Sequence, residues 1–135
     1  MKITELRGAY LDYWVARAEG YTNINGPYET DWVFCLREPD GSDGDALPEY
    51  STDWSAGGPI IDREKISIRH IQLMTGYWVI AASLEVRATE ACTGIISGKP
   101  LIGVGWYVGD TPLQAAMRAY VASKFGDEVP DEEPA

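Results

Sequence analysis

One segment of the chain carries apolar residues at every second position over ten residues. Within residues 77–86 these are Trp78, Ile80, Ala82, Leu84 and Val86. Side chains spaced in this way share one face of a β-strand, whereas a helix would scatter them around its axis. An apolar strand face must be covered by another layer, so the segment predicts a sheet with helices packed against it.

Three other segments are also predicted to be strands. Residues 66–73 alternate in the same way, with a shift of phase that predicts a β-bulge, and Thr75-Gly76 predicts the turn to the next strand. Residues 101–108 contain glycines that allow close approach of backbones. With residues 77–86 these two segments pair most simply as an antiparallel meander. A short apolar run at residues 32–36 predicts an edge strand.

The last predicted helix has both a start signal and a stop signal. Thr111-Pro112-Leu113-Gln114 combines a capping box with proline at the first helical position, and Gly126 follows the expected end at Phe125. Arg118 is expected to point away from the core. The apolar stripe expected to lie on one face of the sheet is Leu113, Ala116, Met117, Tyr120 and Val121.

The first predicted helix runs from about residue 5 to residue 18, capped by Thr4 and ended by Gly20. Its apolar residues reach around most of the cylinder, so it must be covered on two sides or shared with another subunit. The chain also contains 5 Trp and 8 Tyr residues, more than a small core readily hides. Both features predict a homo-oligomer.

The central segment "YSTDWSAGGPII", residues 50–61, mixes helix-starting residues with helix breakers. Ser51 or Thr52 is expected to cap a turn that begins at Asp53, and the pair Gly57-Gly58 is expected to interrupt it. Pro59 then suits the first position of a second turn. The segment therefore predicts a short broken helix.

Two interpretations of this segment stay open. In the first, it is a packing element in which Trp54 fills a gap and the glycines let backbones approach. In the second, free amides at both broken ends bind an anion, or a polar ring that stacks on Trp54. The candidate ligand-binding residues are Ser51, Thr52, Asp53, Trp54, Gly57, Gly58, Arg63 and Arg118.

The formal net charge of −10 comes from two segments. Residues 38–49 and 127–133 each contain five acidic residues and no Lys or Arg, and the remaining 11 acids are balanced by 11 bases. Both segments are rich in Pro or Gly, as solvated loops and tails are. We therefore expect one α+β domain over residues 1–126 and an acidic flexible tail over residues 127–135. This distribution argues against nucleic-acid binding and against DNA mimicry.

The sequence contains no apolar run long enough for a membrane span and no secretory signal, so we expect a soluble protein of the cytoplasm. Cys35 and Cys92 lack metal-ligand spacing and are expected to be small buried side chains. The Asp/Gly run that starts at Asp40 lacks the twelfth-position Glu of a calcium loop. No metal and no cofactor are expected.

His70 is the only side chain that could act as a base at neutral pH, and it falls in a predicted strand with no Ser or Cys beside it. A structural histidine is the simpler interpretation. We identify no catalytic residue, and an enzyme ranks third among the possible functions.

Three motifs resemble the NinX family of phage and prophage accessory proteins. They are "ELRGAYLDYWVARAEGY", "YSTDWSAGGPIIDREKI" and "GDTPLQAAMRAYVASKFGDEV". The recurring Ser-Thr-Asp-Trp and Gly-Gly-Pro-Ile-Ile of the family correspond to residues 51–54 and 57–61. Residues 22–49 and 88–104 look like variable insertions.

The resemblance implies a phage or prophage genome, a dispensable accessory role and no agreed biochemical activity, and it suggests a small phage α/β sandwich domain. From the residues we expect an antiparallel sheet of three to four strands, packed by N- and C-terminal helices, with the broken helix at its edge. The first functional hypothesis is a noncatalytic binding protein for a small polar or nucleotide-like ligand, with counter-defence as its biological use. The alternative is an interaction module that modulates a host or phage protein.

Overall fold

The computed structural model describes residues 1–25, 34–84, 95–96, 99–100 and 105–130, and it confirms the α+β class. The predicted strand residues 32–33 and 101–104 lie outside these ranges, as does Cys92. No helix within the described ranges is long and apolar enough to span a membrane. The elements are η1 (Ile3–Glu5), α1 (Gly8–Ala18), β1 (Ile24–Asn25), β2 (Cys35–Arg37), β3 (Asp43–Ala46), α2 (Trp54–Glu64), β4 (Ser67–Gln72), β5 (Trp78–Ser83), β6 (Ile95–Ile96), β7 (Lys99–Pro100), β8 (Tyr107–Gly109) and α4 (Pro112–Phe125).

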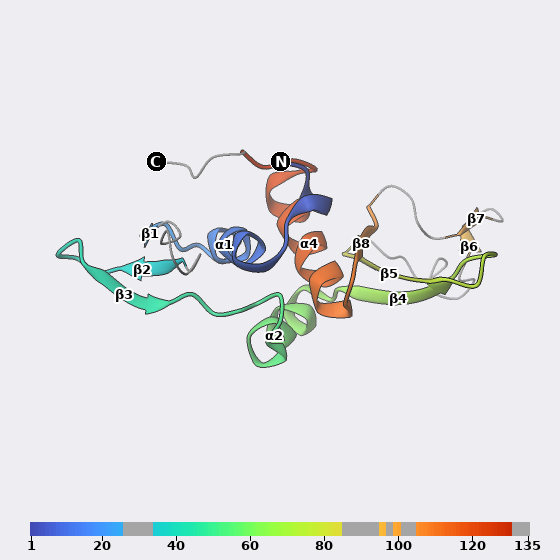
Figure 1. Cartoon of the computed structure of the whole chain (residues 1–135), viewed down its shortest axis with the longest axis horizontal. Coiled ribbons are helices and arrows are strands. Elements are labelled where there is room, and N and C mark those ends of the chain that lie inside the picture. The colour runs from blue at the N-terminus through green and yellow to red at the C-terminus, as the bar shows by residue number, and fades with distance from the viewer. Residues whose placement is uncertain (26–33, 85–94, 97–98, 101–104, 131–135) are drawn as a thin grey trace.

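The helix α4 occupies the centre of the molecule (Figure 1). It contacts α1, α2 and the sheet formed by β4, β5 and β8. A second sheet, of β1, β2 and β3, lies on the opposite side of the helices (Figure 1). Met1 lies beside Val129, shortly after the end of α4. This layout makes α4 the element on which the rest of the fold is assembled.

The predicted cap, start and end of α4 are confirmed. Thr111 Oγ1 accepts a hydrogen bond from the Gln114 N–H at 3.1 Å, and Gly126 follows the helix with a φ of 89°. The predicted core stripe is buried throughout. The expectation that Arg118 points away from the core is wrong, since only 3% of this residue is exposed. Because α4 has helices on one side and a sheet on the other, little of its surface faces solvent.

The predicted meander is present as an antiparallel sheet in the order β4-β5-β8. The pairing of β4 with β5 runs without interruption from Ser67 opposite Ser83 to Gln72 opposite Trp78, so the predicted bulge is absent. Trp78 is 63% exposed although it shares the face of buried Ala82. The hairpin therefore extends beyond the layer that covers its base.

The sheet of β1, β2 and β3 was not predicted as a sheet. β2 pairs with β1 on one side and with β3 on the other, so it is a central strand and the prediction of an edge strand is wrong. Cys35, in β2, is buried as expected. Short strands rich in Asp and Gly carry little alternation, which is why the sequence pattern did not reveal this sheet.

The first helix is shorter than predicted, and Thr4 does not cap it. A 3-10 turn over Ile3–Glu5 comes first, the chain then extends, and α1 begins at Gly8. Gly8 has a φ of 57°, a left-handed conformation that favours glycine. Gly20 has a φ of 103° and Tyr21 N–H bonds to Ala16 C=O at 3.1 Å, so the predicted glycine stop is confirmed.

The middle helix is confirmed, but it is one continuous helix and not a broken one. α2 has Asp53 as its cap, in place of the predicted Ser51 or Thr52, and it ends at Lys65 in a left-handed conformation. Pro59 lies inside it, and it costs the helix one hydrogen bond because proline has no N–H. Gly57 is held against Leu113 of α4, so tertiary packing outweighs the local tendency to break.

The start of the predicted acidic tail pairs with the N-terminus. The Met1 amino group donates to Val129 C=O at 2.7 Å, and Val129 N–H donates to Met1 C=O at 2.9 Å. Val129 is 4% exposed. Residues 131–135 lie outside the described ranges, so a flexible tail stays a prediction for those residues alone.

Candidate functional site

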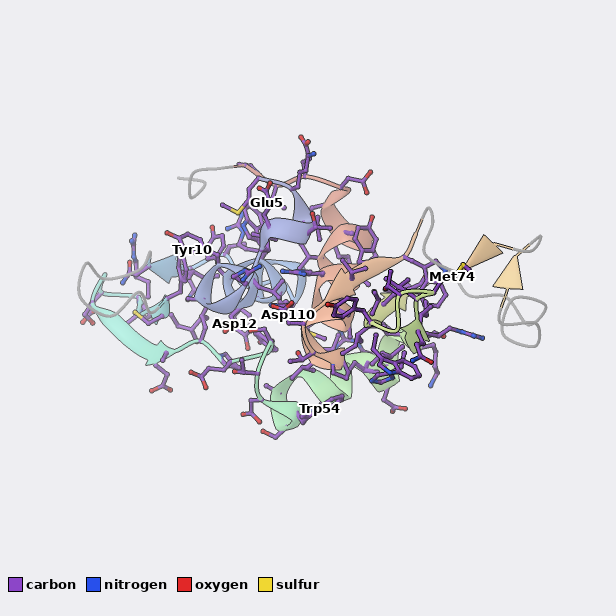
Figure 2. The ribbon with its side chains drawn as sticks, turned by 45° about the vertical axis from the view of Figure 1, so that its right-hand side comes forward. Glu5, Tyr10, Asp12, Trp54, Met74 and Asp110 are labelled. Atoms are coloured by element: carbon purple, nitrogen blue, oxygen red, sulfur yellow. The ribbon has the colours of Figure 1, made fainter. Side chains whose placement is uncertain are left out.

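A hollow of about 340 Å³ lies where the N-terminal ends of α1, α2 and α4 come together. Figure 2 shows Asp110, just before α4, near Asp12 of α1, with Trp54 at the start of α2 below them. Eight residues line the hollow: Gly8, Ser51, Thr52, Trp54, Asp110, Thr111, Leu113 and Gln114. Segments more than a hundred residues apart in the chain thus share one site.

Ser51 forms a buried part of the wall. Its main-chain N–H donates to Asp12 Oδ1 at 2.8 Å, and the residue is 4% exposed. Its hydroxyl oxygen is buried, and apart from the Asp12 carboxylate, whose pKa it lowers, it has no hydrogen-bond partner among the described residues. A buried hydroxyl with so few partners at the wall of a hollow can be satisfied further by a ligand or by water.

Asp12 supports this wall from behind. It is 8% exposed, and no Lys or Arg of the described residues forms an ion pair with it. Burial raises the pKa of its carboxylate, contact with Ser51 opposes this rise, and the charge of Glu49 adds to it. The hydrogen bond to Ser51 therefore compensates part of the cost of burying a carboxylate.

The indole of Trp54 stands at the open side of the hollow and is 55% exposed. Asp53 caps α2 by accepting hydrogen bonds from the Ser55 N–H at 2.9 Å and the Ser55 hydroxyl at 2.7 Å. These bonds lower the pKa of the Asp53 carboxylate. The Trp54 indole is thus accessible for stacking, while the Asp53 carboxylate beside it caps α2.

Most of the predicted free amides are absent from this segment. The N–H groups of Thr52, Asp53, Ser55, Ala56 and Gly57 all have hydrogen-bond acceptors within the fold. The unbroken helix also offers no second set of free amides at Gly58. Recognition at this wall must therefore come mainly from side chains.

The start of α4 forms the facing wall. Gln114 Oε1 accepts a hydrogen bond from the Asp110 N–H at 2.7 Å, which locks the polar residues before the helix in place. The Asp110 carboxylate itself has no hydrogen bond or ion pair with the described residues. None of the eight described residues that line the hollow is Lys or Arg. The lining therefore carries a negative charge and no positive one.

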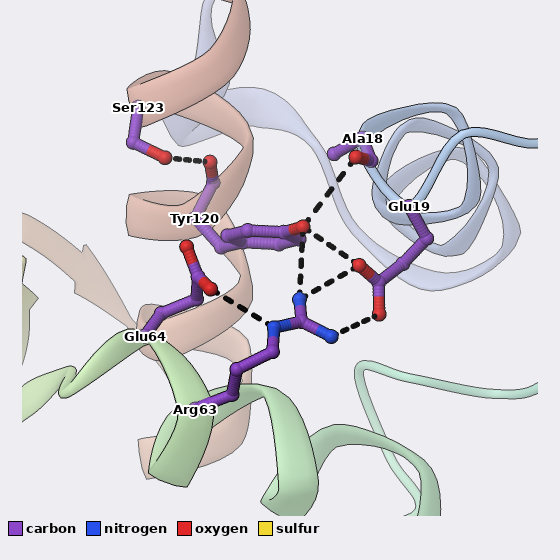
Figure 3. A network of polar contacts seen from close by, with 6 residues as sticks. All are labelled: Ala18, Glu19, Arg63, Glu64, Tyr120 and Ser123. Atoms are coloured by element: carbon purple, nitrogen blue, oxygen red, sulfur yellow. Dashed lines mark hydrogen bonds and ion pairs between the residues drawn. The ribbon is translucent and has the colours of Figure 1, made fainter.

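Arg63 lies at the other end of α2 from Trp54. Figure 3 shows its guanidinium between Glu19, Glu64 and Tyr120, with an Nη2 to Glu19 Oε2 distance of 2.7 Å. The Tyr120 hydroxyl donates to the same Glu19 oxygen at 2.7 Å. This network joins the ends of α1 and α2 to α4, and Arg63 is not part of the hollow.

Arg118 is engaged inside the fold. Its Nε donates to Leu6 C=O at 2.9 Å and its Nη1 donates to Val108 C=O at 2.8 Å. Burial lowers the pKa of its guanidinium, and Arg7 acts in the same direction while Asp110 opposes it. Nη2 is buried without a partner among the described residues. Arg118 thus ties the segment before α1 and the strand β8 to α4.

The two glycines of α2 differ in their surroundings. A Cβ on Gly57 would lie 2.6 Å from both Leu113 Cδ1 and Tyr50 C=O, whereas a Cβ on Gly58 would meet only Trp54 Cε3 at 4.0 Å. Gly57 lets α2 approach α4 closely, and Gly58 has no comparable packing role. Neither glycine lines the hollow.

The structure brings together only part of the predicted site. Ser51, Thr52 and Trp54 line the hollow, and Asp53 caps the helix beside it. The sequence interpretation missed the lining residues Gly8, Asp110, Thr111, Leu113 and Gln114. The capping box before α4 was a usable signal, but it was taken as a helix start and not as part of a site.

Comparison with known proteins gives one family match. A family model described as Bacteriophage P22, NinX matches residues 2–124 of the chain. The match covers α1, α2, all of α4 except its last residue, and every described residue that lines the hollow. No curated protein matches the chain.

Proposed function

The chain belongs to the NinX family of bacteriophage P22, a family of phage accessory proteins, and we propose that it is a noncatalytic protein that binds a small polar, nucleotide-like molecule in the hollow. One observation carries this proposal. A half-exposed indole, that of Trp54, stands in a hollow that is also lined by the buried Ser51, whose hydroxyl has no hydrogen-bond partner among the described residues other than the Asp12 carboxylate. Sequestering a host signal molecule in a counter-defence role would be the biological use of such binding.

The dimensions and lining suit a small ring. A volume of about 340 Å³ falls at the lower end of small-molecule sites, which are typically concave and partly apolar. Trp54 and Leu113 supply apolar surface, while Ser51, Thr52 and Asp110 supply polar groups. Stacking of a base on an aromatic side chain contributes about 1 to 3 kcal/mol, enough to make Trp54 the main anchor.

The lining favours binding over catalysis. It contains no His, Cys or Lys, so none of the lining residues could act as a base for the Ser51 hydroxyl at neutral pH. His70 is exposed on β4 and does not line the hollow. The residues at the site therefore lack a nucleophile paired with a base.

Calorimetric titration with nucleosides, nucleotides and nucleotide signals tests this proposal. We expect one member of the panel to bind, and Trp54→Ala to weaken its binding at least tenfold, as the loss of about 1.4 kcal/mol of stacking requires. Trp78→Ala is the matched control and should bind as the wild type does. Silence across the panel, or equal weakening by both substitutions, would argue against the hollow as a binding site.

A different surface favours a second candidate, the modulation of a host or phage protein. The tip of the β4–β5 hairpin exposes Leu73, Met74, Tyr77 and Trp78. Figure 2 shows Met74 toward the hairpin side of the molecule, away from Trp54. Residues 66–84 contain no Asp or Glu, in contrast with the acidic chain as a whole. Clustered exposed apolar side chains of this kind are typical of protein interaction sites.

The two candidates differ in which tryptophan they require. Docking through the tip predicts that Trp78→Ser abolishes a purified complex with a phage or host protein, while Trp54→Ala leaves it intact. Deletion of residues 131–135 separates a contribution of the acidic tail, since that deletion spares the buried Val129. A complex that survives Trp78→Ser would contradict docking at the tip.

A further inference from the structure

We infer that the hollow recognises the edge of a heterocycle that presents N–H donors beside a carbonyl oxygen, as guanine does, and that it does not recognise a phosphate. This inference rests on the proposed binding function and adds the class of ligand. It is carried by the exposed Asp110 carboxylate, which lines the hollow without a hydrogen bond or an ion pair to the described residues, and by the lack of Lys and Arg among the eight lining residues.

No Lys or Arg is among the eight lining residues, and the charge of Asp110 opposes that of the buried Arg118 nearby. Arg63 is held by Glu19 and Glu64 at the far end of α2, and Arg118 is held by main-chain carbonyls inside the fold. The positive ends of the α2 and α4 dipoles are partly occupied as well. The Asp53 side chain accepts a hydrogen bond from the Ser55 N–H at the start of α2, and the Thr111 side chain accepts one from the Gln114 N–H at the start of α4. A phosphate in the hollow would instead face the charge of Asp110.

The Asp110 carboxylate selects for hydrogen-bond donors. A carboxylate is an acceptor only, with two oxygens that can receive two parallel N–H groups. A cyclic amide with a neighbouring amino group presents such a pair on one edge. A ring that carries an acceptor in their place would face the carboxylate with another electron-rich atom, which costs affinity.

The start of α1 offers the complementary donor. α1 has no side-chain cap, and its first residue, Gly8, lines the hollow. The first N–H groups of a helix have no acceptor within that helix, so they suit a ring carbonyl oxygen. A Cβ on Gly8 would meet no atom within 4 Å, so this wall has open space in front of it.

Ring stacking sets the plane of such a ligand. Trp54 provides an exposed aromatic face at the mouth, and buried Leu113 forms apolar wall in the same hollow. When the face of a ligand ring is stacked on the indole, the polar groups on the edge of that ring stay free to bind other residues. Gly8 starts α1 and Asp110 precedes α4, whereas Trp54 starts α2. Gly8 and Asp110 can therefore contact the edge of the ligand ring while Trp54 covers its face.

Calorimetric titration of the full chain with four compounds tests the inference: guanosine, inosine, guanosine 5′-monophosphate and inorganic phosphate. Inosine lacks the amino group of guanosine and keeps its carbonyl oxygen. We expect guanosine to bind at least tenfold more tightly than inosine, since a good bidentate contact gives discrimination of this order. The 5′-phosphate should bring no gain, and inorganic phosphate should not bind.

Asp110→Asn should reduce guanosine binding about tenfold and close most of the gap to inosine, because the amide presents a donor where one guanosine N–H needs an acceptor. Asp62→Asn removes the same charge from an exposed position of α2 outside the hollow and should leave both affinities unchanged. Circular dichroism checks that both variants fold.

The outcomes separate this inference from the proposed function. Binding of guanosine monophosphate tenfold above guanosine, with dependence on Trp54, would overturn the donor-edge inference and leave the binding function standing. Equal binding of guanosine to Asp110→Asn and wild type would overturn the inference as well. No Trp54-dependent binding of any compound, here or in the wider nucleotide panel, would overturn both.

Discussion

The carboxylate of Asp12 in α1 accepts a hydrogen bond at 2.8 Å from the main-chain N–H of Ser51, which lies 39 residues further along the chain. Both residues are buried. The bond fastens the loop before α2 to the core helix α1. One wall of the candidate binding hollow is therefore positioned by a contact with the core and not by the loop itself.

The first prediction concerns this bond. Asp12→Asn keeps an oxygen acceptor for Ser51 and removes a buried charge, so we expect a free energy of unfolding equal to or above that of the wild type at pH 7. Asp12→Ala leaves the buried Ser51 N–H without an acceptor and should cost about 1 to 3 kcal/mol. Urea unfolding of the three proteins measures both values.

The same pair has a defined pH dependence. Because the folded state raises the pKa of Asp12 above its ordinary value of 3.8, the wild type loses stability as the pH rises from that value through the raised pKa. The free energy of unfolding of Asp12→Asn minus that of the wild type should therefore increase as the pH rises through that interval. Below the interval this difference should stop changing with pH. A difference that stays constant down to pH 3 would contradict a buried, titrating Asp12.

The second prediction uses the two neighbouring glycines of α2 as a matched pair. Gly57→Ala places a methyl group 2.6 Å from Leu113 Cδ1 and Tyr50 C=O, so it should lower the free energy of unfolding by about 1 to 3 kcal/mol. Gly58→Ala meets open space and should raise it by up to about 1 kcal/mol, because alanine favours the helix. Thermal unfolding of both variants measures these effects. If both substitutions stabilised the protein, the close packing of α2 on α4 would be contradicted.

The third prediction concerns the network in Figure 3. Tyr120→Phe removes the hydroxyl that donates to Glu19 and should cost about 1 to 2 kcal/mol. Burial alone would raise the pKa of Glu19, but hydrogen bonds from Arg63 and Tyr120 outweigh it and hold that pKa below its ordinary value. The stability from ionised Glu19 is thus complete above the ordinary pKa and is lost as the pH falls through the lowered one.

Urea unfolding across pH checks this sign. The difference between wild type and Tyr120→Phe should be largest near neutral pH and should shrink below about pH 4, where Glu19 takes up a proton. A difference that increases on acidification would show that the hydroxyl serves another partner.

The fourth prediction is self-association through the apolar hairpin tip when no other partner is present. Two acidic chains repel each other least where they meet through a segment without Asp or Glu, as residues 66–84 are. Light scattering after size-exclusion chromatography should show a dimer that grows with concentration and that Trp78→Ser weakens. Tyr21→Ser, at an exposed aromatic of another segment, should have no effect. A monomer mass at every concentration would remove this prediction.

Much of the fold follows from local patterns in the sequence. The alternation in residues 77–86 and the cap before α4 are strong signals: α4 forms where expected and β5 forms inside the expected range, of which residues 85–86 lie outside the described ranges. The continuity of α2 was missed because the close fit of Gly57 against Leu113 is a tertiary contact that no local pattern reveals. The burial of Arg118 was missed for the same reason, since its acceptors lie on Leu6 and Val108.

The sequence predicted the residues of only one wall of the hollow. Ser51, Thr52 and Trp54 are adjacent in sequence and could be grouped by inspection. Gly8 and Asp110 join them only because α1 and α4 start at the same place in space, which depends on how the helices pack. The charge of Asp110 is, in the assembled hollow, the group that defines the proposed ligand.

A crystal structure of the protein purified from infected cells, with the ligand that accompanies it, tests the central claim most directly. The account predicts flat electron density over the Trp54 indole, with one edge within hydrogen-bond distance of the Asp110 carboxylate. A hollow that holds only solvent, while the copurifying molecule is bound at another surface, would contradict it.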